Sequence, residues 1–358
     1  MKIFEQMAFS GSEQVVWGSD PASGLKAIIA IHSTARGPAL GGTRMYPYRS
    51  EEEALQDVLR LARGMTYKAA AAGLALGGGK AVLIGDPARE KSEALLRAYG
   101  RLINTLGGRY ITTEDVGTSQ QDMDVIRRET KYVAGTSPET GGSGDPSPYT
   151  ALGVFHGIRA ALGEVFRTDN PAGRVVAVQG AGKVGYNLCR LLADAGARLI
   201  VSDVDEAKAR KAAAEFDAEV AEPEEISGVE CDLFAPCALG ATVNERTVRQ
   251  FQCRIIAGAA NNVLAEEKYG DLLHQMGILY VPDYVINAGG LINVAQELEP
   301  VGYRREKAVE KVKRIYDTTL TVLKLARQEN IPPYWAAARL AEERLRERGL
   351  EQDRRKTA

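Results

Sequence analysis

The sequence predicts an α/β protein of two domains, and three observations support this fold class. From residue 24 to residue 111, strand-like runs such as LKAIIAI and KAVLIG alternate with helix-like runs such as SEEEALQDVLRLARGM. Residues 135–150, GTSPETGGSGDPSPYT, cannot hold a regular helix or a central strand and predict a linker or hinge. Beyond them, the order strand, glycine loop, helix and strand predicts a parallel sheet with crossover helices.

These patterns predict a first domain over residues 1–148 and a second domain over residues 149–330. The second domain begins with the helix TALGVFHGIRAALGEVF, and the later apolar runs CDLFAPC, CRIIAGAA and ILYVPDYVI supply further strands. Residues 331–358 predict a C-terminal helix with a charged tail that packs back toward the first domain.

Length and composition narrow the class of protein. The chain has 358 residues, of which 45% are hydrophobic and 26% charged, and this is enough for two cores. Its net charge of −2 gives no electrostatic reason to expect nucleic acid or an anionic membrane as a partner. The start, MKIFEQMAFSGSEQ, has no apolar signal segment, and no stretch reaches membrane-spanning length. We therefore expect a cytoplasmic protein with small-molecule partners.

The cysteines and histidines do not form a metal-binding pattern. No CxxC pair occurs, and the histidines lie far apart in the sequence. We therefore expect no metal site and no disulfide framework, with the cysteines buried as small apolar side chains. The residues concerned are Cys189, Cys231, Cys237, Cys253, His32, His156 and His274.

The glycine loop GAGKVG predicts a dinucleotide site. It follows the strand RVVAVQ and opens the helix GYNLCRLLADAG, which is the context that gives the GxGxxG pattern its meaning. The first glycine permits the tight turn, the second lets the pyrophosphate approach the backbone at the helix N-terminus, and the third lets the helix lie close to the sheet. A plain glycine turn is the alternative. The loop comprises Gly180, Ala181, Gly182, Lys183, Val184 and Gly185.

Asp203 indicates which dinucleotide the loop prefers. It ends the strand RLIVSD after the loop, where a carboxylate accepts hydrogen bonds from ribose hydroxyls and repels a 2′-phosphate, so NAD is favoured over NADP. Lys208 and Arg210 lie further along and are expected on the solvated face of the next helix. The alternative for Asp203 is a helix N-cap.

Two lysines of the first domain lie in unusual surroundings. MTYKAAAAGLALGGGKAV places Lys68 at the end of an apolar helix and Lys80 after three glycines. Desolvation, and a second ammonium nearby, would lower the pKa of one of them and make it a general base, while the other binds an anion. The alternative is that both side chains reach solvent. Asp115, in YITTEDVGT, is either a helix cap or an acid/base group.

The chain resembles a known family, that of the leucine, valine and phenylalanine dehydrogenases, which are relatives of glutamate dehydrogenase. Within this family it is most similar to the leucine-active members. The resemblance covers nearly the whole length, in the family's order. The matching stretches are GPALGGTRM, GMTYKAAAAGL, LGGGKAV, RYITTEDVGT, GAGKVG, APCALGATVN, IAGAANN and PDYVINAGGLINV. The resemblance implies a substrate and oligomerisation domain, then a Rossmann NAD-binding domain across a cleft, in a homo-oligomer, octamer or dimer.

The resemblance also implies roles for single residues. Lys80 would be the catalytic lysine, Asp115 the proton donor and acceptor, and Lys68 the ligand of the substrate α-carboxylate. Asn262 would assist at the substrate, and three residues would lie near the cofactor. These are Thr150, Ala238 and Asn287. The implied reaction is reversible oxidative deamination of an amino acid to a 2-oxo acid and ammonia.

The implied substrate pocket is mostly apolar. Where glutamate dehydrogenases carry a lysine before paired glycines, this chain has Leu40 before Gly41, so an acidic substrate loses its partner. The same comparison adds Thr113, Leu291 and Val294 to the pocket. Thr113 replaces an alanine and Leu291 a valine of the leucine-active pattern. Leucine, valine and isoleucine are the expected substrates, with phenylalanine or another aromatic amino acid as the alternative; Leu40 as core filler remains open.

Two rival functions fit the glycine loop. A 2-hydroxy-acid dehydrogenase needs a histidine base after the loop, and only His274, in the helix-like GDLLHQMGI, is available. A sensor that binds NAD without catalysis needs none of Lys68, Lys80, Asp115 and Asn262, so their joint presence argues against it.

Overall fold

The computed structural model describes residues 2–238 and 240–356 and divides the chain into two compact units. Unit 1 holds the chain up to Asp145, the segment Val294–Arg305, and α13 from Ala341 onward. Unit 2 holds Pro146–Asn293 and Glu306–Leu340. The expected division at residues 148 and 330 therefore needs correction. The first boundary falls earlier, and the chain returns to unit 1 twice because two later segments complete its core.

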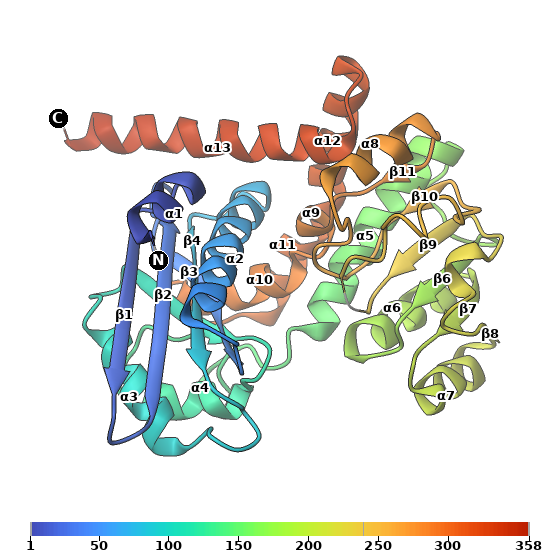
Figure 1. Ribbon diagram of the computed structural model, residues 1–358. Helices are drawn as coiled ribbons and strands as arrows, with labels where there is room; N and C mark the ends of the chain where they lie inside the picture. Colours follow the sequence, from blue (N-terminus) through green and yellow to red (C-terminus); the bar gives the residue numbers. More distant parts are fainter. Residues whose placement is uncertain (1, 239, 357–358) are drawn as a thin grey trace. The chain divides into compact units, whose positions relative to one another are not determined.

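Unit 1 is built on a five-stranded mixed sheet of order β1-β2-β4-β3-β5 (Figure 1). β3 runs parallel to both β4 and β5, whereas β2 is antiparallel to β4 and to β1. The expected strands and helices occur, and β1 and β3 are additional. The elements up to the unit boundary are α1 (Ile3–Ser10), β1 (Gln14–Asp20), β2 (Leu25–Ser33), β3 (Ala39–Tyr46), α2 (Glu51–Ala71), β4 (Gly77–Ile84), α3 (Glu93–Asn104), β5 (Tyr110–Glu114), α4 (Gln120–Arg127) and the 3₁₀ turn η1 (Pro138–Thr140).

Both faces of this sheet are covered, as the alternation along β2 shows. Ile28 and Ala30 pack with Leu55 and Val58 of α2, whereas Ile29 packs on the opposite face with residues of α3 and α4. A strand buried on both faces reads as a continuous apolar run, which is why LKAIIAI was recognisable as a strand. α2 therefore covers one face of the central strands, and side chains from even-numbered positions of β2 and β4 point toward it.

Unit 2 has a six-stranded, all-parallel sheet of order β11-β10-β9-β6-β7-β8. Numbered from its own first strand and read from the β8 edge, the order is 3-2-1-4-5-6, that of the Rossmann fold. The elements from the unit boundary to the end of the chain are α5 (Ser147–Phe166), β6 (Val175–Gln179), α6 (Lys183–Asp194), β7 (Arg198–Ser202), α7 (Glu206–Phe216), β8 (Glu219–Val220), η2 (Ile226–Gly228), β9 (Leu233–Pro236), β10 (Ile255–Ile256), α8 (Glu267–Gln275), β11 (Leu279–Tyr280), α9 (Asp283–Ile286), α10 (Gly289–Ala295), η3 (Gln296–Leu298), α11 (Arg305–Lys313), α12 (Ile315–Glu329) and α13 (Pro333–Lys356). Of these, η3 lies wholly within unit 1, and α13 lies within it from Ala341 onward.

Two apolar clusters sandwich this second sheet. Val176 and Val178 of β6 pack with α5 and α6, whereas Ala177 faces the cluster that contains Tyr269 and Leu273 of α8. The switch point of the strand order lies between β6 and β9, the place where ligands bind in open α/β sheets.

The Gly, Pro and Ser-rich segment is held by side chains rather than by regular structure. The Glu297 carboxylate accepts backbone N–H groups from Gly135 at 3.0 Å and Ser143 at 2.7 Å, and Asp124 accepts from Ser137 at 3.0 Å. The expected linker ends early, because α5 begins at Ser147.

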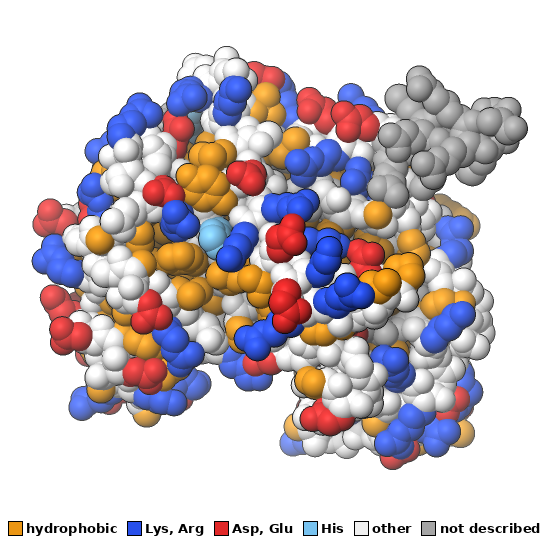
Figure 2. Space-filling view, turned by 180° about the vertical axis from the view of Figure 1, so that it is seen from behind, with side chains coloured by type: hydrophobic (Ala, Val, Ile, Leu, Met, Phe, Trp, Pro, Cys, Tyr) orange, Lys and Arg blue, Asp and Glu red, His pale blue; other side chains and the backbone are white. Residues whose placement is uncertain are grey.

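The four cysteines are free thiols, with Cys189 and Cys253 buried and Cys231 and Cys237 half-buried. Within residues 2–238 and 240–356 no group of His, Cys, Asp and Glu side chains is arranged to hold a metal ion. Across the same residues, no helix combines the length and apolar character needed to cross a membrane. Basic and acidic side chains are interspersed over the face seen in Figure 2.

Candidate active site

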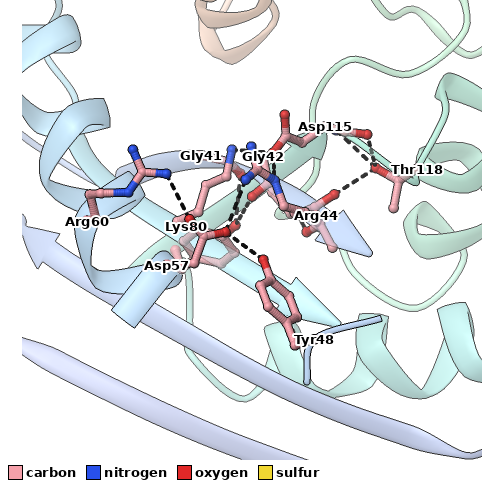
Figure 3. Close-up of polar contacts among 12 residues, drawn as sticks. Gly41, Gly42, Arg44, Tyr48, Asp57, Arg60, Lys80, Asp115 and Thr118 are labelled. Atoms are coloured by element: carbon pink, nitrogen blue, oxygen red, sulfur yellow. Dashed lines mark hydrogen bonds and ion pairs between the residues drawn. The ribbon is translucent and has the colours of Figure 1, made fainter. Parts of the chain in front are cut away.

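The centre of the candidate site is a contact between Lys80 and Asp115. Lys80 lies in β4 and is only 6% exposed, so its side chain does not reach solvent. Its Nζ lies 2.7 Å from Oδ2 of Asp115, which follows β5 (Figure 3). Asp115 is not a helix cap, because Ser119 caps α4 with a capping box. A proton can therefore pass directly between the two side chains.

Glycine residues create the space for this contact. A Cβ on Gly42 would lie 2.8 Å from Cβ of Asp115 and 3.1 Å from Nζ of Lys80. Gly42 belongs to β3, between the strands that carry the lysine and the aspartate. Any larger residue there would push the pair apart.

Arg44 is a third member of the cluster. Its Nε donates to Oδ2 of Asp115 at 3.2 Å, so this one carboxylate oxygen contacts both Arg44 and Lys80. Burial opposes ionisation of Asp115, but the charges of Lys80 and Arg44 outweigh it and lower the pKa of Asp115. Asp115 is therefore a carboxylate at neutral pH and available as a proton acceptor.

Lys68 lies in the last turn of α2, where it is half-buried. A Cβ on Gly78 would lie 2.1 Å from the backbone nitrogen of Thr66, so α2 touches β4 beside both lysines. The residues GGG before Lys80 belong to β4, and Gly78 among them lets α2 lie close to the sheet.

Two expected pocket residues share the face of the sheet that carries Lys80. Leu40 pairs with Gly78 of β4 and Ile111 of β5, and Gly42 pairs with Thr113, so Leu40, Thr113 and Lys80 project from the same face. Thr113 is half-buried, and Leu40 has no exposed surface. Gly41 contributes its backbone, and its carbonyl accepts the Tyr110 hydroxyl at 2.8 Å.

The three glycines of GAGKVG meet the three demands of a dinucleotide loop. Gly180 has φ +100°, and a Cβ there would lie 2.8 Å from the Ala238 nitrogen. A Cβ on Gly185 would lie 1.8 Å from the Gly180 carbonyl, so α6 approaches the sheet only without one. At Gly182, the N-cap of α6, nothing lies within 4 Å of such a Cβ, which leaves the backbone open to a phosphate. Ala181 is buried in the loop, and Lys183 and Val184 begin α6.

Asp203 faces this loop. Its carboxylate accepts the N–H of Ala181 at 2.7 Å and that of Asp205 at 2.9 Å. The N-cap of α7 is Asp205, so the alternative role of Asp203 as an N-cap does not apply. Asp203 lies after the second strand of the sheet and beside the glycine loop. Lys208 and Arg210 are exposed on α7 and pair with Asp205 and Glu206, as expected for a solvated face.

The other residues expected near a cofactor also belong to unit 2. Ala238 follows β9 and lies against Gly180. Thr150 in α5 lies close to Gly290, because a Cβ on Gly290 would be 2.7 Å from Oγ1 of Thr150. Asn287 is 3% exposed, and its Nδ2 donates to Oδ1 of Asn261 at 2.8 Å. Its Oδ1 is buried and accepts no hydrogen bond from the described residues. An orphaned acceptor beyond the strand ends, together with the open Gly182 backbone, fits a dinucleotide whose amide can donate.

The remaining predicted residues are Asn262, Leu291, Val294 and the histidine of the rival function. Asn262 is exposed and has φ +51°, a left-handed conformation that asparagine tolerates better than most residues. Leu291 and Val294 are buried in α10, with Leu291 in unit 2 and Val294 in unit 1. His274 is exposed near the end of α8, which is not the setting of a catalytic base.

Comparison with known proteins agrees with this arrangement. A family model described as "Glu/Leu/Phe/Val dehydrogenase, dimerisation domain" matches residues 12–132, and one described as "Glutamate/Leucine/Phenylalanine/Valine dehydrogenase" matches residues 141–207 and 201–352. Leucine dehydrogenase of Geobacillus stearothermophilus is 58% identical over 345 residues, 96% of this chain and 94% of the relative.

Two solved structures have the same fold. The crystal structure of L-tryptophan dehydrogenase from Nostoc punctiforme matches with a TM-score of 0.85 and 48% identity, over 97% of this chain and 99% of that chain. Hetero-hexameric glutamate dehydrogenase from Thermus thermophilus, in a Leu-bound form, matches with a TM-score of 0.80 and 26% identity, over 94% and 89%.

The Rossmann unit, joined to a mixed-sheet unit that carries a buried lysine and aspartate, defines a two-domain dehydrogenase. The chain belongs to the Glu/Leu/Phe/Val dehydrogenase family of amino acid dehydrogenases, oxidoreductases that act on a CH–NH₂ group.

Sequence reasoning missed Arg44 and Asp57 as parts of the site. Arg44 stands in GPALGGTRM, and the available signal was a charged residue within a strand of small and apolar residues. Asp57, on the polar-looking surface of α2, gave no such signal, because its partners Arg44 and Tyr48 lie outside that helix.

Proposed function

We propose that this protein catalyses the NAD-dependent, reversible oxidative deamination of leucine, valine and isoleucine to the 2-oxo acid and ammonia. The observation that carries the proposal is the buried contact between Lys80 and Asp115, in a chain of this family. The high identity to leucine dehydrogenase supports the choice of branched aliphatic substrates.

The dinucleotide is proposed to bind at the carboxyl ends of β6, β7 and β9. Gly180, Gly182 and Gly185 receive the pyrophosphate, Asp203 the ribose hydroxyls, and the orphaned Oδ1 of Asn287 a donor such as a carboxamide. When bound, NAD supplies the acceptor for the hydride that leaves the substrate Cα. The carboxylate of Asp203 supports NAD over NADP, because it repels a 2′-phosphate.

The chain's own residues would hold the substrate and move protons. Lys68 binds the substrate α-carboxylate, and Asn262 assists there. The substrate amine must be neutral for its lone pair to assist loss of the Cα hydride. Water then adds to the resulting iminium carbon while neutral Lys80 takes a proton from that water. Asp115 next accepts that proton from Lys80 Nζ, 2.7 Å away, and passes it to the nitrogen, so that Lys80 is neutral and Asp115 a carboxylate again. The carbinolamine then collapses to ammonia and a 2-oxo acid as its hydroxyl proton moves to the Lys80–Asp115 pair.

The proposed pocket for the side chain is apolar. Leu40 and Thr113 project from the same sheet face as Lys80, and Leu291 and Val294 are buried. One methylene in such a pocket is worth about 1–3 kcal/mol, so Thr113 and Leu291 would adjust preferences among apolar substrates. The likeness to L-tryptophan dehydrogenase supports an aromatic amino acid as the second candidate.

The function is tested in two assays. The first measures NADH oxidation with 4-methyl-2-oxopentanoate with and without ammonia, and turnover without ammonia would identify a hydroxy-acid dehydrogenase instead. The second compares kcat/KM for leucine, valine, isoleucine, phenylalanine, tryptophan and glutamate, each with NAD and with NADP. We expect the branched aliphatic amino acids with NAD to give the highest values. A highest value for phenylalanine or tryptophan would favour the second candidate.

The protein is also proposed to form a homo-oligomer, an octamer or a dimer, through unit 1. The matching family model is described as a dimerisation domain, and a hexameric relative has the same fold. α1 buries none of its residues, and Phe4 and Phe9 are 86% and 94% exposed. A hollow of about 750 Å³ lies between α1 and α2, lined by Phe9 and Leu59 among others. A projecting phenylalanine beside a hollow is the self-complementary pattern that a two-fold contact between copies requires.

A further inference from the structure

We propose that Arg44 is a positioning residue that sets the protonation of the Lys80–Asp115 pair, and that Asp57 and Tyr48 hold Arg44 in place. This inference rests on the proposed function for its kinetic consequences. The geometry behind it is independent of the substrate, because every contact lies within unit 1.

Arg44 bridges two carboxylates that belong to different elements. Its Nε donates to Asp115 Oδ2 at 3.2 Å, and its NH1 donates to Asp57 Oδ2 at 3.0 Å. The three side chains are 16% to 23% exposed, so solvent weakens these contacts less than it weakens surface ion pairs. The planar guanidinium makes the two contacts from two different nitrogens in a fixed geometry, which the single nitrogen of a lysine does not reproduce.

Asp57 is itself fixed from two further directions. Its Oδ2 accepts the hydroxyl of Tyr48 at 2.6 Å, and its Oδ1 accepts NH2 of Arg60 at 2.9 Å (Figure 3). Burial opposes ionisation of Asp57, but these donors and Arg44 lower its pKa. Burial similarly opposes the charge of Arg44, yet the two carboxylates raise its pKa. Arg44 is therefore a permanent cation at a fixed place.

A fixed cation beside a proton-sharing pair lowers the affinity of the pair for protons. Arg44 Nε and Lys80 Nζ both contact Asp115 Oδ2, so Arg44 offsets the Asp115 charge whether or not Lys80 is protonated. The lysine can then become neutral without leaving an uncompensated buried carboxylate. Proton transfer from Lys80 to bulk, or to a substrate group, becomes less costly for the same reason.

The groups that face the pair come from several elements. Lys80 comes from β4, Arg44 from β3, Asp57 and Arg60 from α2, and Tyr48 from the connection between β3 and α2. Beside the loop that follows Asp115, Lys91 donates to the Gly117 carbonyl and pairs with Asp122 at 2.8 Å. Lys91 pairs with that carboxylate, so among the described residues the cations in contact with Asp115 are Lys80 and Arg44.

The test compares Arg44→Met and Arg44→Lys with the matched control Arg97→Met. Arg97 lies on α3, which covers the other face of the sheet. It pairs with Glu129, whose side chain is 15% exposed. In Arg44→Met, we expect the acid limb of the kcat/KM profile to move up by about one pH unit and kcat at neutral pH to fall about tenfold to a hundredfold. KM for the 2-oxo acid should change less than about threefold, since the substrate keeps its own ligands.

Arg44→Lys separates charge from geometry. The charge remains, so the acid limb should stay near its original pH, whereas kcat should still fall because a single ammonium nitrogen does not reproduce the two-nitrogen geometry that fixes both carboxylates. Arg97→Met should move neither quantity. An unmoved acid limb in Arg44→Met, with a loss of kcat no greater than that of the control, would overturn the proposal. If Arg44→Met does not fold, an Arg44→Lys enzyme with wild-type kcat overturns it equally.

A second measurement does not depend on activity. The carboxyl ¹³C resonance of Asp115, assigned with Asp115→Asn, is titrated in the wild-type chain and in Arg44→Met. We expect the midpoint to rise in the variant, and an unchanged midpoint contradicts the proposed charge effect. If the wild-type protein lacks ammonia-dependent turnover but the midpoint still rises, the proposed function fails while the role of Arg44 in this cluster stands.

Discussion

At the scale of single residues, the strongest prediction concerns the effect of replacing Lys80. Lys80→Ala removes the ammonium that contacts Asp115 at 2.7 Å and leaves the Rossmann unit untouched. We expect NAD to bind with unchanged affinity and kcat to fall by about 10² to 10⁴, the usual range for a lost acid/base group. Binding is measured by titration calorimetry and turnover by NADH absorbance. Lys26→Ala, an exposed lysine of β2, is the control, and a wild-type kcat in Lys80→Ala would refute the assignment.

The lowered pKa of Asp57 predicts that the free energy of unfolding depends on pH. Its pKa is lowered in the folded protein, so its ionisation stabilises the fold above its unfolded pKa, about 4, and this contribution disappears as the pH falls through the lower folded value. Asp57→Asn should therefore lower the free energy of unfolding by about 1.5–3 kcal/mol at pH 7, and the deficit should shrink below about pH 4. Urea unfolding at several pH values measures the difference. A deficit that is the same at pH 3 and pH 7 would contradict the assignment.

The residues of the site differ in how far sequence could predict them. Lys80 and Asp115 could be chosen because a lysine among Ala, Leu and Gly is conspicuous and because the family motifs contain both. Their contact with Arg44 depends on β3 lying between β4 and β5, a strand order that no local pattern encodes. Charged partners that meet only through the sheet are therefore invisible until the topology is known.

At the scale of elements, the glycine loop offers a matched pair of substitutions. Gly182→Ala adds a Cβ that meets nothing within 4 Å, at a residue whose φ of −67° suits alanine. Gly185→Ala adds a Cβ 1.8 Å from the Gly180 carbonyl. We expect Gly182→Ala to keep the melting temperature but to weaken NAD binding about tenfold or more, because the added methyl group stands where the pyrophosphate approaches.

Gly185→Ala should instead lower the melting temperature by several degrees, since α6 must move away from the sheet. Calorimetric melting and NAD titration on both variants check the distinction. Equal effects of the two substitutions on melting temperature would show that the loop does not have this geometry.

Helices and strands could be predicted where each corresponds to one continuous run of the sequence. RVVAVQG and RLIVSD gave strands at β6 and β7, and the helix between them begins at Lys183. β1 and β3 were missed because QVVWGSD and ALGGTRMY interrupt their apolar residues with glycine or charge. ILYVPDYVI was expected as a strand but forms the short β11 followed by α9, because Pro282 ends the extended run.

At the scale of the whole molecule, the size of the assembly tests whether α1 takes part in the contact between copies. Phe9→Glu places a charge on an exposed apolar side chain beside the hollow between α1 and α2. We expect a smaller assembly than that of the wild-type protein, measured by sedimentation velocity, because a contact between copies does not tolerate an unpaired buried charge. Val301→Glu, a change at another exposed apolar residue of unit 1, should leave the mass unchanged. An unaltered mass in Phe9→Glu would exclude α1 from the contact.

The division into domains was the least predictable feature, because segments distant in sequence complete unit 1. Val294–Arg305 brings Glu297 to Gly135 and Ser143, and the later half of α13 brings Arg344 to the carbonyls of Ala70 and Ala71 at the end of α2. No local periodicity of residues 294–305 shows that they return to the first unit.

This interleaving has a consequence for any attempt to dissect the protein. A fragment that ends at Asp145 keeps every strand of the five-stranded sheet but lacks the Glu297 acceptor and the Arg344 donor. Backbone groups at Gly135 and Ser143 would then have to find water instead, and Arg36 would lose the Arg344 carbonyl to which it donates. Unit 1 is not contained in one continuous stretch, so its recombination with other dehydrogenases must exchange three stretches of chain together rather than one.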